Sequence, residues 1–163
     1  MSSQLRVDKI LPVDGAPSGG GGGIIQVINT IKTDTFSTSA NLNTKETITG
    51  LTATITPKFN TSKILIQHTN TACGTRDAST HYELYINRNS TRIHTIGTYI
   101  GLSVSTDVCF PTMCYMDSPG TTSAVTYNMI ALRKQGSANC YFNLDNGGSI
   151  SHNAVLMLME VSA

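Results

Sequence analysis

Histidine and cysteine, the side chains best suited to binding metals or acting as nucleophiles, are scattered along this chain of 163 residues. They stand at His68, His81, His94, His152, Cys73, Cys109, Cys114 and Cys140. No two histidines are two or four residues apart, and no two cysteines form a CxxC pair. A structural zinc site needs four ligands at recognisable spacings, so the sequence predicts no metal site.

Motifs for nucleophilic or phosphate chemistry are also missing from the sequence. It has no G-x-S-x-G or H-E-x-x-H motif, and the run Gly19 to Gly23 lacks the lysine and the helix of a phosphate-binding loop. The acidic residues are few and isolated, so paired carboxylates for glycoside hydrolysis could meet only through folding. We expect no enzyme activity, no catalytic residues and no cofactor.

The charge balance excludes further classes of function. Only 13% of residues are charged, the net charge is +1, and the longest basic run is Arg133-Lys134. Nucleic-acid binding and polybasic membrane attachment need a basic cluster, so we expect neither. No apolar stretch approaches the ~20 residues that span a bilayer, and the N-terminus lacks the apolar core of a signal peptide. We expect synthesis in a cytosol, where the cysteines would be buried thiols rather than a disulfide framework.

The elements that must position any site are β-strands. Threonine supplies 23 positions, serine 16 and asparagine 12, and all three are poor helix formers. Apolar and polar residues alternate in short segments between turn residues, as in strands. Residues 129–136 also contain good helix formers, but they continue one of these segments, so we expect a strand there. The expected strands cover 24–28, 46–56, 63–67, 81–87, 91–96, one or two within 102–115, 123–132, 139–144 and 155–161. About eight to ten strands predict an all-β, antiparallel β-sandwich or jelly roll.

Two shorter parts precede this β-sandwich domain of residues 24–163. Residues 1–18 form an extended N-terminal arm, because two prolines prevent a lasting helix. Residues 19–23 form a flexible glycine linker. The arm is either a disordered tail or a segment that docks on another subunit. Its regular apolar positions favour docking, and they form the expected anchoring site: Leu5, Val7, Ile10, Leu11 and Val13.

The last strand is apolar on both faces, whereas a sandwich strand of a monomer has one wet face. Leu156 and Leu158 are expected to fill the sandwich. The opposite face requires a loop or another subunit, and we favour a subunit interface formed by Val155, Met157, Met159 and Val161. Two expected loops, 73–81 and 95–105, are either ordinary solvated loops or sites of recognition, and their candidate contact residues are Arg76, Asp77 and Tyr99.

Several segments, in order along the chain, resemble one group of proteins. They are 3–10 (SQLRVDKI), the glycine run with 24–27, 50–57 (GLTATITP) with 62–65, 116–127 (MDSPGTTSAVTY) and 158–161 (LMEV). The sequence is similar to tail-fibre and other virion structural proteins of bacteriophages, especially phages of aquatic cyanobacteria. This resemblance implies a virion protein, commonly trimeric, with a jelly-roll-like domain and no enzyme activity. The chain is short for the group, whose comparable domain often ends a longer fibre.

The first hypothesis is therefore a homotrimeric tail-fibre-type protein, made in the host cytoplasm and located in the virion. Its arm would bind other virion proteins, and its β-domain would contact a glycan or protein of the host surface. The alternatives are a capsid decoration protein and a cellular carbohydrate-binding β-sandwich module. The arm argues against the last of these, because a lectin needs no glycine-tethered apolar segment.

Overall fold

A computed structural model describes residues 23–69, 73–75, 79–100, 110–143 and 153–162, with the side chains of 98–100 excepted. These residues contain eleven β-strands and no helix. The strands are β1 (Ile24–Lys32), β2 (Phe36–Thr38), β3 (Lys45–Ile55), β4 (Lys63–Thr69), β5 (Cys73–Gly74), β6 (His81–Arg88), β7 (Thr91–Ile100), β8 (Thr112–Asp117), β9 (Val125–Gln135), β10 (Cys140–Phe142) and β11 (Ala154–Val161).

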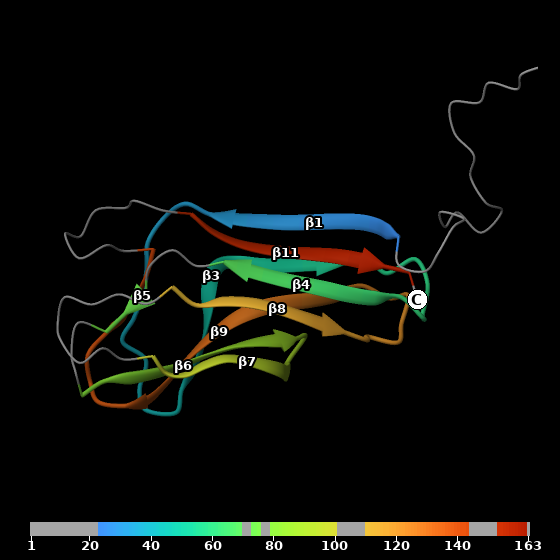
Figure 1. Ribbon diagram of the computed structural model, residues 1–163. Helices are drawn as coiled ribbons and strands as arrows, with labels where there is room; N and C mark the ends of the chain where they lie inside the picture. Colours follow the sequence, from blue (N-terminus) through green and yellow to red (C-terminus); the bar gives the residue numbers. More distant parts are fainter. Residues whose placement is uncertain (1–22, 70–72, 76–78, 101–109, 144–152, 163) are drawn as a thin grey trace, which may run out of the picture.

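The strands pair as one long hairpin that is rolled over on itself. The innermost pair is β6–β7, followed outward by β4–β8, β3–β9 and β1–β11, all antiparallel. The nested pairs divide into two four-stranded sheets, β1-β11-β4-β8 and β3-β9-β6-β7 (Figure 1). This is the double-sheet arrangement of a jelly roll. In the small third sheet, β2-β10-β5, strand β5 lies at the end of the sandwich away from the C-terminus (Figure 1).

The two large sheets pack face to face through alternating apolar residues. In β3 the side chains of Ile48, Leu51 and Ile55 are buried, while the threonines between them are exposed. Threonine suits these outer positions because its branched side chain packs well on a pleated surface. Gly50, with φ at +87°, lies where the register of β3 against β9 shifts, and this bulge returns Leu51 to the core.

The structure confirms the all-β sandwich and every expected strand that falls within the described residues. Residues 129–135 continue β9 as a strand. The strand count exceeds the expected range because β2 and β5, with three and two residues, are too short to show an alternating pattern. The arm 1–18, nearly all of the linker 19–23, and residues 102–109 lie outside the described residues.

The expectation that the cysteines are buried is wrong for one of them. Cys73 and Cys140 are buried, but Cys114 is exposed. Alternation along β8 explains the difference, because Met113 and Tyr115 on either side face the core and turn Cys114 outward. Cys109 lies outside the described residues.

Candidate functional site

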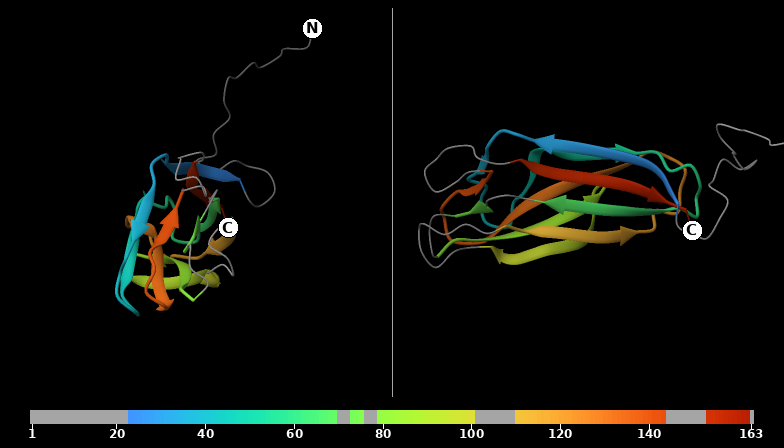
Figure 2. Two further views of the ribbon diagram at one scale, coloured as in Figure 1. Left: turned by 90° about the vertical axis from the view of Figure 1, so that its left-hand side faces the viewer. Right: turned by 45° about the horizontal axis from the view of Figure 1, so that its top comes forward.

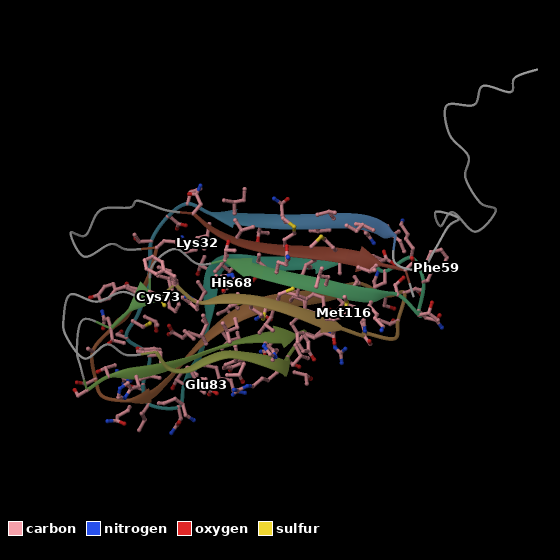
Figure 3. All side chains as sticks on the ribbon, viewed as in Figure 1. Lys32, Phe59, His68, Cys73, Glu83 and Met116 are labelled. Atoms are coloured by element: carbon pink, nitrogen blue, oxygen red, sulfur yellow. The ribbon has the colours of Figure 1, made fainter. Side chains whose placement is uncertain are left out.

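An exposed apolar row crosses the outer face of the sheet β1-β11-β4-β8. The strand register places Val27, Met159, Leu65 and Met116 side by side on the four strands. Val27 and Met116, on the two edge strands, are 51% and 43% exposed, and the two residues between them are half-buried. Figure 2 shows these four strands next to one another, and Figure 3 labels Met116 on β8. The row is therefore open to a partner surface along its whole length.

Two further rows extend this face, and neither contains a charged residue. They are Asn29, Met157, Gln67 and Cys114, and then Ile31, Val155, Thr69 and Thr112. Strand and residue spacings give the three rows an area of about 400 Å². Its apolar part is smaller than this, because Asn29, Gln67, Thr69 and Thr112 within the rows are polar. We call these three rows the uncharged face.

Strand β11 divides its side chains between the core and the outer side of the sheet, where all but Val161, which pairs with Lys63, belong to the uncharged face. Leu156 and Leu158 are fully buried in the sandwich, as the alternation predicted. Val155, Met157, Met159 and Val161 are half-buried on the opposite side. The assignment of the two faces is thus confirmed, whereas association through the outer face stays a prediction.

Sequence reasoning missed the residues that complete the uncharged face on the neighbouring strands: Val27, Ile31, Leu65 and Met116. The alternation in β1 does signal that Val27, Asn29 and Ile31 share one side. Which strands lie beside β11 is decided by long-range pairing, and no local pattern in the sequence contains that information.

A hollow of about 200 Å³ lies within the uncharged face, lined by Gln67, Thr69, Val155 and Met157. Its lining residues belong to β4 and β11, which are hydrogen-bonded neighbours at this position. None of the four side chains titrates or is a usual nucleophile. The hollow therefore suits a protruding side chain of a partner surface and offers no groups for acid–base catalysis.

A buried carboxylate fixes the end of this sheet where the N-terminal residues depart. Glu160 of β11 is fully buried and accepts hydrogen bonds from Gln26 Nε2 at 2.5 Å and from the backbone N–H of Lys58 at 2.7 Å. Burial raises the pKa of Glu160, but the hydrogen bonds, that of Gln26 first, outweigh burial and hold the pKa below its usual value. The N–H of Ser162 also donates to the Gly23 carbonyl at 3.0 Å. Gly23, the first described residue, is therefore held at the end of the sheet.

His68 lies beneath the uncharged face, on the core side of β4. It is buried, and its Nδ1 lies 3.0 Å from the carbonyl oxygen of Val155. Burial lowers its pKa to about 4, although the bond to Val155 acts in the opposite direction. The imidazole is therefore neutral at pH 7 and is enclosed by the core, where no substrate can reach it.

The remaining expected site residues are not brought together in the described structure. The anchoring positions Leu5, Val7, Ile10, Leu11 and Val13, together with Arg76 and Asp77, lie outside the described residues. The expectation that Tyr99 lies in a loop is wrong, because residues 95–100 continue strand β7 in its pairing with β6, and the Tyr99 side chain is not described. The described histidines, cysteines and acidic residues form no group of three or more that could hold a metal ion. The described part of the chain has no helix of the length and apolar character needed to cross a membrane.

Comparison with known proteins gives the fold and no family. No family model and no curated protein sequence matches the chain. The VP2 subviral particle of infectious bursal disease virus is similar, with a TM-score of 0.50 and 11% identity over 83% of this chain and 39% of that one. Structures of the Gx and Gt strains of this virus are also similar to this chain, each with a TM-score of 0.51, and their sequence identities are 11% and 12%. Those two matches cover 98% of this chain and 42% and 41% of theirs.

These neighbours are viral capsid proteins, and at such low identity the likeness shows the shared jelly-roll fold alone. The chain spans about two fifths of the length of the chains it matches.

Proposed function

We propose that this protein is a non-enzymatic structural protein of a bacteriophage virion. Its copies associate as homotrimers through the uncharged face, with β11 close to the threefold axis. The arm of residues 1–18 attaches the trimer to other virion proteins. The β-domains stay exposed for contact with the host surface, as in a tail fibre.

The observation that carries this proposal is the uncharged face itself. An antiparallel sandwich of a monomer keeps one face of each sheet in water. Here three rows across four strands lack any charge, and Val27, Ile31 and Met116 are all at least 43% exposed. Copies of the same neutral face can pack together without leaving a buried charge unpaired. An assembly subunit needs such a surface, and an isolated enzyme or lectin domain does not.

Two further observations support a virion protein. The fold is shared with viral capsid proteins, although it alone does not define a function. The sequence also resembles phage virion proteins from its first residues to its last strand. The fixed position of Gly23 at the end of the sheet, beside Glu160, suits an arm that reaches a neighbouring protein.

The test compares purified phage particles that carry the full chain with particles that carry a chain lacking residues 1–18. The full chain should be found in the particles at a fixed copy number. The shortened chain should remain folded and trimeric in the lysate but be missing from the particles. Normal occupancy by the shortened chain would show that the arm is not the anchor. A full chain found only in the lysate would reject a virion role.

A capsid decoration protein is the second candidate, and the likeness to viral capsid proteins is the observation that favours it. Cryo-electron microscopy of the same particles distinguishes the two, because a decoration protein would cover the shell at every lattice position. A tail-fibre-type protein would appear only at the tail. A cellular carbohydrate-binding module would appear at neither place.

A further inference from the structure

An exposed aromatic side chain lies next to the uncharged face, at the start of β8. Phe110 is 59% exposed, the highest value among the large apolar side chains of the described residues. Exposure alternates from Phe110 through Thr112 and Cys114 to Met116. A residue before proline is held in an extended conformation, so Pro111 lets Phe110 continue the line of β8. Phe110 therefore extends the outer side of this edge strand by one further position.

The hollow described above lies towards the same end of the sheet. Strand β8 begins where β4 ends and where β11 begins (Figure 1). Thr69, which lines the hollow, pairs with Thr112, two residues from Phe110. The ring does not fill the hollow of its own copy, because 59% of Phe110 remains exposed. One copy thus presents both a protruding ring and a neighbouring recess.

The hollow suits a phenyl ring in size and in chemistry. Its volume is about 200 Å³, and a cavity of about 150 Å³ accommodates benzene. Val155 and Met157 give the lining apolar surface, and a methionine sulfur makes favourable contacts with aromatic rings. A charged side chain would lose its hydration there without gaining an ion partner. Among the exposed large apolar side chains of the described residues, Phe110 is the only aromatic one.

We propose that the Phe110 ring of each copy inserts into the hollow of the next copy in the trimer. A ring of three copies is built from heterologous contacts, in which a patch on one copy meets a different patch on its neighbour. The protruding ring and the recess are such a pair of patches. The inference rests on the proposed function, because it names the contact through which the uncharged faces associate.

The experiment places a fluorescent reporter at the proposed contact. The full chain contains no tryptophan, so Phe110→Trp introduces a single indole. As the protein concentration rises through the midpoint of trimer formation, followed by sedimentation velocity, its emission should move to shorter wavelength because the indole leaves water. Leu42→Trp is the matched control, since Leu42 is 53% exposed and its neighbour Asn43 bonds β9 of the other sheet. Its emission should stay that of a solvated indole.

Two further variants test the contact without a reporter. Phe110→Ala should raise the midpoint concentration of trimer formation at least tenfold, because three buried rings are lost. Thr69→Phe places a ring at the hollow of the same copy and should also weaken association. Combined with Phe110→Ala, Thr69→Phe should cause no additional loss, because no incoming ring remains to be blocked. Leu42→Ala should leave the midpoint unchanged.

Three results overturn the inference alone: trimers in which the Phe110→Trp indole stays solvated, an unchanged midpoint for Phe110→Ala, or additive effects of Phe110→Ala and Thr69→Phe. An unaltered chain that is monomeric at every concentration rejects the proposed assembly, and this contact with it. Phe110 and Thr69 are both exposed, so the variants should unfold at the same temperature as the unaltered chain when all are monomeric.

Discussion

Tyr127 on β9 donates a hydrogen bond of 2.7 Å to Asp117 Oδ2 on β8 and so joins the two large sheets. Both residues are buried. Arg88 on β6 donates to the two oxygens of the same carboxylate at 3.0 and 3.1 Å, which balances its charge. Burial, followed by the bond to Asp117 and its charge, raises the pKa of Tyr127 far above its usual value. The hydroxyl is therefore protonated and donates this hydrogen bond at neutral pH.

Tyr127→Phe should lower the free energy of unfolding by about 1–3 kcal/mol, because a buried carboxylate loses one of its donors. Urea unfolding at pH 7 measures the change. Tyr115→Phe is the matched control, because Tyr115 lies on β8, the strand that carries Asp117. Its side chain is half-buried, and its ring stacks on His94. This substitution should change stability by less than about 0.5 kcal/mol. Equal effects of the two substitutions would mean that the Tyr127–Asp117 bond contributes nothing specific.

His68 makes stability depend on pH. Its pKa is about 4 in the folded protein and 6.5 in a free side chain, so between these values the unfolded chain binds more protons. Stability is therefore complete above pH 6.5 and falls as the pH drops towards 4. Between pH 7 and pH 5 the unaltered protein should lose about 2 kcal/mol more than His68→Leu. Urea unfolding at both pH values checks this, and parallel losses in the two proteins would contradict it.

Glu160→Gln should loosen the loop between β3 and β4, because a neutral amide oxygen is a weaker acceptor for the Lys58 N–H. Trypsin should then cleave faster after Lys58, which is exposed. Since the pKa of Glu160 is lowered in the fold, its contribution is present at neutral pH and is lost as the pH falls through that lowered value. Glu46→Gln on β3 is the control and should leave the cleavage rate unchanged. If Glu160→Gln is cleaved no faster than this control, Glu160 does not hold the loop.

Local patterns were sufficient to predict most of the fold. Alternation identified long strands such as β3 and β11, and asparagine and serine identified the turn between β6 and β7, where Asn89 has φ at +55°. Residues whose environment is decided by distant partners were harder to predict. Lys32 ends β1 and has the sequence character of a solvated residue, but it is 2% exposed because its methylene carbons lie beside Gly50 of β3. Glu160 is buried because Gln26 of β1 and Lys58 of the loop between β3 and β4 supply its donors.

The candidate site was predicted only in part for the same reason. The sequence indicates that β11 has a second apolar face, since its own residues show it. The full uncharged face exists only after four strands have paired. Val27 and Met116 lie at opposite ends of one row but belong to strands far apart in the sequence. A single strand's alternation cannot show which other strand continues its surface.

Association through the uncharged face is the central claim, and sedimentation velocity of the full chain at micromolar concentration tests it most directly. The unaltered chain should sediment as a trimer. Val27→Asp and Met116→Asp, at exposed positions on the two edge strands, should each sediment as folded monomers because a charge enters the interface. Thr54→Asp, exposed on the outer side of the other sheet, should remain trimeric. A monomeric unaltered chain, or trimers of both face variants, would contradict the account.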